Sequence, residues 1–214
     1  MTTATPVSAQ PDQPLLHVEA PSTGAPVPLP SAWWVLVAGV IGLCASTALT
    51  VEKIRILLNP SYVPSCNLNP VLSCGSVMAA PQASVFGFPN SLIGIAAFTV
   101  VVVSGVLAVT KVPLPQWYWT RLAAATAVGD VFMHWLIFES LYRIGALCPY
   151  CMVVWAVTVP LQVVLASIAF PPASENRTVA QALYHWRWSI TALWFTAVLL
   201  LILTRFWDYW STLF

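Results

Sequence analysis

The sequence predicts an all-α integral membrane protein, and three observations support this prediction. Hydrophobic residues make up 59% of the 214 residues and charged residues only 7%, whereas soluble domains carry about 25% charged residues. Five apolar segments each approach or exceed the ~20 residues that a helix needs to cross the hydrocarbon core of a bilayer. Tryptophans gather at the ends of these segments, as in the aromatic belt of a membrane interface: Trp33, Trp34, Trp117, Trp119, Trp186 and Trp188.

The five predicted spans cover residues 33–57, 91–110, 118–138, 150–170 and 188–206. In lipid the backbone must satisfy its own hydrogen bonds, and these segments are too long for barrel strands, so each is expected to be a helix. Residues 1–30 are rich in Pro, Ala, Ser and Thr and lack the basic start of a signal peptide. They are expected to form a disordered cytoplasmic tail, and residues 31–214 a single transmembrane domain.

The longest connection, residues 59–90, contains many Pro, Gly, Ser and Asn residues, which mark turns. Residues 75–80, with the sequence GSVMAA, are expected to form a short helix within it. A loop of this length in a compact bundle is usually functional. The function is therefore expected to depend on this loop.

Four of the five cysteines form two pairs. Cys66 and Cys74 lie eight residues apart in the long loop, and Cys148 and Cys151 open the fourth span with the sequence CPYC. An even number of crossings separates the pairs, so both are expected on one face of the membrane. The fifth cysteine, Cys44, lies within the first span and is expected to be a small residue at a helix contact.

Three interpretations of the paired cysteines remain open. Four thiolates can hold zinc, although no histidine lies near and we predict no metal site. Two static disulfides suit an oxidising compartment, and the protein would then be a non-catalytic transporter or scaffold. The third interpretation is exchange between the pairs, which needs one mobile pair and one fixed pair. We favour exchange because a CxxC at a helix N-terminus has its first thiol activated by free N–H groups and the helix dipole.

The side of the membrane follows from this chemistry and not from the charges. The net charge is +1, which gives no sign of a nucleic-acid partner. Lys and Arg residues divide equally between the two sides of the predicted spans, so the positive-inside rule does not orient the chain. Disulfides persist only outside the reducing cytoplasm. We therefore expect a multi-pass protein of the inner or plasma membrane, with a cytoplasmic N-terminus and an extracytoplasmic cysteine loop over residues 59–90.

Three stretches resemble the vitamin K epoxide reductase family. They are the Cys66/Cys74 pair with Ser73 before its second cysteine, VFGFPNSLIG at residues 85–94, and IGALCPYC at residues 144–151. The resemblance covers roughly residues 33–170 and is to the bacterial members, which form disulfides. It implies a four-helix bundle around a quinone, which the sequence extends by a fifth transmembrane helix.

The resemblance also implies a quinone-dependent thiol:disulfide oxidoreductase. The loop pair would take electrons from a thioredoxin-like dithiol protein on the extracytoplasmic side, and Cys148 and Cys151 would pass them to menaquinone or ubiquinone in the membrane pool. We interpret Cys66 as the cysteine that meets the partner and Cys74 as the one that meets Cys148. Some bacterial members carry a fused thioredoxin-like domain after a fifth span, whereas this sequence stops at Phe214. A separate partner protein is therefore expected.

Two further residues are assigned to the quinone by this resemblance. Asn90 matches a family asparagine that hydrogen-bonds the quinone carbonyl. Trp155 stands where the vertebrate enzymes have a tyrosine, which favours quinone reduction with disulfide formation over epoxide reduction. Trp155 also follows Cys151 by four residues, so the two share a helix face. The indole would stack on the flat quinone ring or, in the alternative, pack against lipid or a neighbouring helix.

Two pairs of polar residues lie in or near the third span. Asp130 and His134 are four residues apart and would relay protons or only hold the bundle together. Glu139 and Arg143, also four apart, are expected to form an interfacial ion pair.

Overall fold

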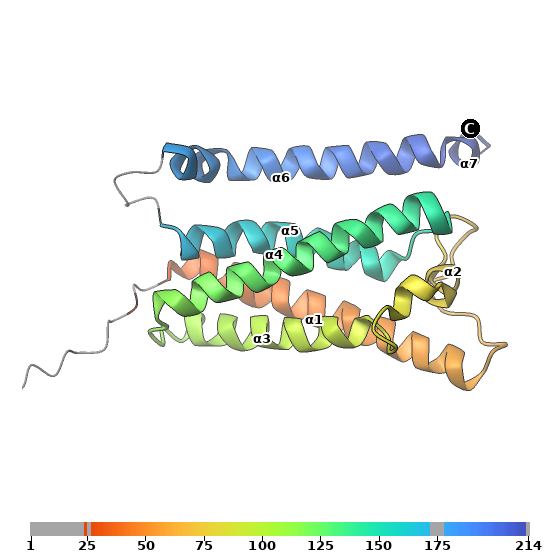
Figure 1. The fold of residues 1–214 in the computed structure, drawn as a ribbon, viewed down its shortest axis with the longest axis horizontal. Coiled ribbons are helices and arrows are strands. Elements are labelled where there is room, and N and C mark those ends of the chain that lie inside the picture. The colour runs from red at the N-terminus through yellow and green to blue at the C-terminus, as the bar shows by residue number, and fades with distance from the viewer. Residues whose placement is uncertain (1–23, 25–26, 172–177, 213–214) are drawn as a thin grey trace, which may run out of the picture.

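The computed structural model describes residues 24, 27–171 and 178–212 and is built from helices (Figure 1). Within these residues, five helices are long and apolar enough to cross a membrane, which confirms the predicted fold class. They are α1 (Leu29–Leu58), α3 (Ser91–Val109), α4 (Gln116–Phe138), α5 (Pro149–Ala169) and α6 (Thr178–Arg205). The predicted tail lies almost entirely outside the described residues.

Shorter helices complete the ends of the bundle. The long loop contains α2 (Cys74–Ala79) and a 3-10 helix, η1 (Pro81–Ser84), so the short helix expected there is present. A π-helical segment, η2 (Glu139–Ile144), extends α4, and α7 (Trp207–Trp210) follows α6. The third span therefore runs six residues past its predicted end at residue 138, and α6 begins ten residues before its predicted start at residue 188.

The core is a bundle of four helices, in which α1 packs on α3 and α5, and α4 packs on α5. Small residues permit the closest of these approaches. A Cβ added to Gly105 would lie 2.6 Å from the Leu36 Cα, and one added to Gly42 would lie 2.3 Å from the Phe98 ring. The α6 helix lies outside these four and contacts α5 (Figure 1).

Two sequence-based expectations about single side chains in the bundle are wrong. Cys44 is exposed and points away from the helix contacts, because the α1–α3 contact uses Gly42, Ala45 and Ser46 on the other side of the helix. Trp119 is only 1% exposed and packs in the core. The other five tryptophans assigned to the aromatic belt are exposed on the surface.

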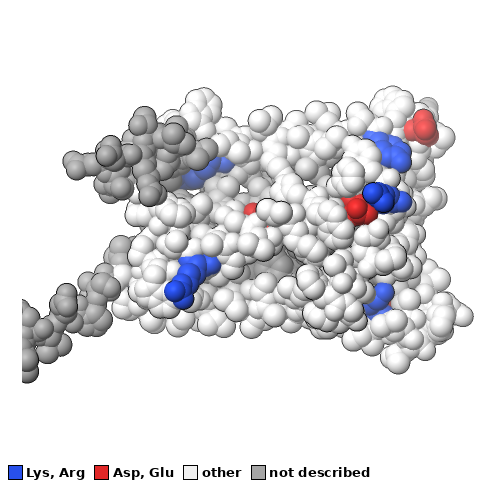
Figure 2. All heavy atoms as spheres, viewed as in Figure 1, with Lys and Arg blue, Asp and Glu red and all other residues white. Residues whose placement is uncertain are grey.

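The outer surface of the bundle carries few charged groups. Figure 2 shows that Lys and Arg side chains lie toward the two ends of the molecule, while the middle of this face is almost free of charge. A chain with this distribution places apolar side chains in the hydrocarbon region and charged ones near the headgroups.

Candidate active site

The two cysteine-bearing segments meet at one end of the bundle, where a short parallel bridge joins them. The bridge pairs Leu72 with Leu147. The Leu147 N–H donates to the Val71 carbonyl at 2.7 Å, and the Ser73 N–H donates to the Leu147 carbonyl at 2.9 Å. Each segment of the bridge leads into a helix, α2 two residues after Leu72 and α5 two residues after Leu147. The bridge therefore fixes the position of Cys74, at the start of α2, relative to Cys148, at the start of α5.

The bridge brings together the sulfur atoms of Cys74 and Cys148. Cys66 and Cys74 form a disulfide, whereas Cys148 and Cys151 are free thiols. The Cys148 Sγ lies 3.2 Å from the Cys74 Sγ, and both residues are fully buried. Exchange begins when a thiolate approaches one sulfur of a disulfide. The geometry of this contact suits exchange between the two pairs.

The start of α5 activates Cys148. This residue is the N-cap of α5, and Pro149 occupies the first turn, where its missing N–H is no loss. A hydrogen bond from the Cys151 thiol lowers the pKa of Cys148, and the backbone N–H groups of Cys151 and Tyr150 act in the same direction. Burial of the thiol acts in the opposite direction, with an effect smaller than that of the hydrogen bond from Cys151. Cys148 is therefore the better nucleophile of the CxxC pair.

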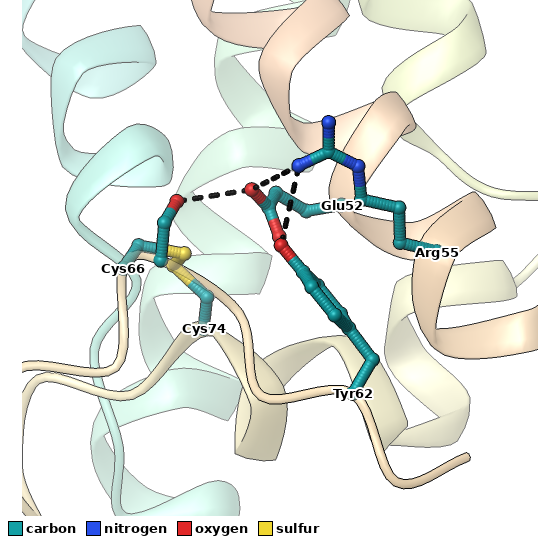
Figure 3. A network of polar contacts seen from close by, with 6 residues as sticks. Glu52, Arg55, Tyr62, Cys66 and Cys74 are labelled. Carbon is teal, nitrogen blue, oxygen red and sulfur yellow. Dashed lines mark hydrogen bonds and ion pairs between the residues drawn. A yellow bond between two sulfur atoms is a disulfide. The ribbon is translucent and has the colours of Figure 1, made fainter. Parts of the chain in front are cut away.

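The other sulfur of the disulfide belongs to Cys66, whose segment is bonded to the end of α1 (Figure 3). Cys66 is 6% exposed. The Ser65 hydroxyl donates to Glu52 Oε1 at 3.0 Å, and Arg55 lies 3.6 Å from the same oxygen. Arg55 also donates to the Tyr62 hydroxyl at 3.2 Å. We expected the loop pair to be mobile and accessible. In the structure Cys66 is buried, and its segment is held to α1 through Ser65 and Glu52.

A cavity of about 400 Å³ lies among α1, α3, α4 and α5, next to the cysteines. Its lining is mainly apolar, and it includes three of the predicted site residues, Cys151, Asn90 and Trp155. Cys151 and Trp155 therefore do share one face of α5. Of the CxxC pair, Cys151 lines the cavity, while Cys148 is turned toward Cys74.

The polar wall of the cavity contains residues that the sequence analysis did not assign to a site. The Asn90 amide donates to the Gln82 carbonyl at 2.6 Å and accepts from the Val85 N–H at 3.1 Å. Gln82 Nε2 donates to Glu139 Oε2 at 3.0 Å. Lys53 also lines the cavity, and its Nζ donates to the Met78 carbonyl at 2.5 Å. Charged residues are rare in membrane spans, and this rarity could have marked Lys53 and Glu139 as candidate site residues in the sequence.

The expected ion pair between Glu139 and Arg143 is wrong. Both residues belong to η2, whose hydrogen bonds join residues five apart. Residues four apart lie on one face of an α-helix but not of this wider turn. Glu139 is instead 7% exposed and faces the bundle, where it bonds to Gln82.

Asp130 and His134 lie away from the cavity wall and do not bond through their side chains. The His134 Nδ1 is 2.7 Å from the Asp130 backbone carbonyl, and the Trp194 indole N–H donates to His134 Nε2 at 2.7 Å. Trp194 belongs to α6. His134 therefore joins α6 to α4, which corresponds to the alternative in which the pair holds the bundle together.

The sequence model of the vitamin K epoxide reductase family matches residues 33–166, which hold both cysteine pairs and the four core helices apart from the first turn of α1 and the end of α5. The chain belongs to the vitamin K epoxide reductase family. None of the curated proteins matches it. Family membership together with five membrane-length helices indicates a multi-pass membrane oxidoreductase of the disulfide-forming kind.

The other two interpretations of the cysteines fit this family member less well. Two of the four sulfurs that a zinc site would need are joined as the Cys66–Cys74 disulfide. Among residues 24, 27–171 and 178–212, no group of three or more His, Cys, Asp or Glu side chains is arranged to hold a metal. A scaffold with two static disulfides does not explain free thiols at Cys148 and Cys151.

Proposed function

We propose that this family member oxidises a thioredoxin-like dithiol protein outside the cytoplasm and passes the electrons to a membrane quinone. The observation that supports the proposal is the 3.2 Å contact between the Cys74 and Cys148 sulfurs, beside a cavity that Cys151 lines. In this proposal the N-terminus is cytoplasmic and the cysteine end of the bundle faces the oxidising side, where disulfides persist.

The first stage transfers electrons from the partner to the loop pair. A thiolate of the partner attacks the Cys66 sulfur, the Cys66–Cys74 bond breaks, and Cys74 leaves as a thiolate. The second thiolate of the partner then attacks its own sulfur in the mixed disulfide and releases Cys66. The partner has lost two electrons and two protons, and it leaves with a disulfide.

The second stage transfers the same electrons to the CxxC pair. The Cys74 thiolate attacks Cys148 in a Cys148–Cys151 disulfide, and Cys151 leaves. Cys66 then attacks Cys74, which reforms the loop disulfide and releases Cys148. The product of this stage has the bonding seen in the structure, a Cys66–Cys74 disulfide beside two free thiols.

The cavity has the properties of a quinone site. Its volume of about 400 Å³ and mainly apolar lining lie within the range of pockets that bind small apolar ligands, ~300–1,000 Å³. A bound quinone would supply an acceptor for two electrons and two protons. The Asn90 amide nitrogen has a second N–H besides the one donated to Gln82, which suits a carbonyl. Trp155 offers a flat aromatic face four residues from Cys151.

Replacement of Asn90 by alanine is expected to weaken quinone reduction about tenfold, because one hydrogen bond of ~1–1.5 kcal/mol is lost. Asn90→Asp is the matched control for the loop, since its carboxylate still accepts from the Val85 N–H but donates nothing. Both variants are expected to show the loss in steady-state quinone kinetics. Reduction of the Cys66–Cys74 disulfide by dithiothreitol should proceed as in the wild type. Normal quinone kinetics in both variants would remove Asn90 from the site.

A Cys74→Ser variant is expected to hold the partner in a mixed disulfide through Cys66. Cys66 retains some exposure, whereas Cys74 is fully buried against Cys148, so Cys66→Ser should trap much less. Both variants are isolated from host membranes after acid quenching and alkylation, and adducts are read by non-reducing electrophoresis and mass spectrometry. A thioredoxin-like adduct on Cys66→Ser alone would reverse the order of the loop cysteines, and its absence from both would contradict the proposed partner.

A further inference from the structure

Glu139 places a buried carboxyl group on the wall of the cavity. It is 7% exposed, at the point where α4 passes into η2. Burial of a carboxyl group is costly unless it is paired or hydrogen-bonded. Within the described residues, its recorded partner is a neutral amide, Gln82 Nε2 at 3.0 Å. A buried carboxyl group beside a pair of redox-active cysteines is a candidate functional group.

Gln82 connects Glu139 to Asn90 and has spare hydrogen-bonding capacity. Its backbone carbonyl accepts from Asn90 Nδ2 at 2.6 Å, and its side-chain amide donates to Glu139. Its Oε1 atom is buried and has no hydrogen-bond partner within the part of the chain that the structure describes. A buried acceptor without a hydrogen-bond donor destabilises the protein. A hydroxyl group in the cavity would satisfy this atom, and a quinol has hydroxyl groups where a quinone has only acceptors.

The other charged residue on the cavity wall, Lys53, is held in place by a hydrogen bond. Lys53 Nζ donates to the Met78 carbonyl at 2.5 Å, which ties the cation to α2. Glu139 and Cys151 line the same cavity from α4–η2 and α5. Among the acidic residues that the structure describes, Glu139 lines the cavity, whereas Asp130 is not part of this wall. Glu139 is thus placed to exchange a proton with groups in the cavity.

We propose that Glu139 is the proton-exchanging residue of the cavity, an inference that rests on the proposed quinone reduction. Formation of the Cys148–Cys151 bond removes two electrons and two protons from the two thiols, and conversion of a quinone to a quinol requires the same number. The Glu139 carboxylate accepts the proton of the Cys151 thiol and then gives it up within the cavity. The second proton, that of the more acidic Cys148 thiol, is exchanged through solvent. Glu139 returns to its starting state after each turnover.

The test separates proton exchange from binding and from folding. Glu139→Gln preserves the size of the side chain and an acceptor for Gln82 Nε2 but cannot carry the proton. Loss of one acid–base group is expected to lower kcat by ~10²-fold, with KM and the quinone Kd, measured by tryptophan fluorescence, unchanged within about twofold. Glu139→Asp should recover much of the lost turnover. Asp130→Asn, the control outside the cavity wall, should behave as the wild type.

A second measurement, made without quinone, tests whether the substitution disturbs thiol exchange between the cysteine pairs. The rate at which dithiothreitol reduces the Cys148–Cys151 disulfide through the loop pair should be unchanged in Glu139→Gln. Wild-type turnover in Glu139→Gln, a rise in Kd equal to the fall in turnover, slowed thiol exchange, or no recovery in Glu139→Asp would each overturn the inference. A wild-type protein that fails to reduce quinone would instead overturn the proposed function.

Discussion

Replacement of either Cys148 or Cys151 by serine is expected to abolish quinone reduction, with turnover lowered by at least ~10³-fold. A serine oxygen cannot form the disulfide by which the two electrons leave the protein. The substitution is nearly isosteric, and both variants should insert into membranes and purify as the wild type does. Cys44→Ser is the matched control, because Cys44 is a free cysteine exposed on α1, away from the other four.

The two variants should differ in one respect that identifies the role of each thiol. Cys148 is the residue in contact with Cys74, so Cys148→Ser should also stop electron transfer from the loop pair. Cys151→Ser retains Cys148 and should accumulate the mixed disulfide between Cys74 and Cys148, visible by mass spectrometry of unreduced peptides. Turnover at a normal rate in either variant would contradict exchange through the CxxC pair.

A double variant, Cys66→Ser with Cys151→Ser, is expected to form a Cys74–Cys148 disulfide in nearly all molecules under mild oxidation. The two sulfurs already lie 3.2 Å apart, and the bridge between Leu72 and Leu147 holds their backbones in register. Proximity of this kind makes disulfide formation effectively unimolecular. Peptide mapping without reduction measures the yield.

The control for this cross-link is Cys74→Ser with Cys151→Ser, which leaves Cys66 and Cys148. Cys66 lies on the other side of the disulfide, in the segment bonded to Glu52 through Ser65. It should cross-link to Cys148 slowly and in low yield. Equal yields in the two double variants would show that the loop is not held by the bridge, and the assignment of Cys74 to Cys148 would fail.

The transmembrane helices could be predicted from the sequence because composition and length decide them. Apolar runs of membrane length admit only helices, and both bounds of the second and fourth predicted spans agree with α3 and α5 to within one residue. The third span was predicted too short because the charged residues Glu139 and Arg143 end the apolar run, whereas the chain continues as a wider π-turn as far as Ile144. Gly145, with φ of 70°, then ends it.

The cysteines of the candidate site could be predicted from the sequence, but their arrangement in space could not. The spacing of Cys148 and Cys151 is a local pattern, and the number of crossings places this pair on the same face of the membrane as the loop pair. The bridge between Leu72 and Leu147 joins segments far apart in the chain through backbone atoms, which no side-chain pattern records. The Gln82–Glu139 contact also joins distant parts of the chain, 57 positions apart, so no local pattern in the sequence indicates it.

The measurement that tests the central claim most directly is the yield of quinol by the purified wild-type protein. The protein, in detergent with a soluble ubiquinone or menaquinone analogue, is mixed anaerobically with a reduced thioredoxin-like protein that carries a CxxC pair. Quinol is followed by ultraviolet absorbance and partner disulfide by thiol titration. We expect one quinol for each partner disulfide formed. Partner oxidation without quinol, or no reaction by a folded protein with intact cysteines, would contradict it.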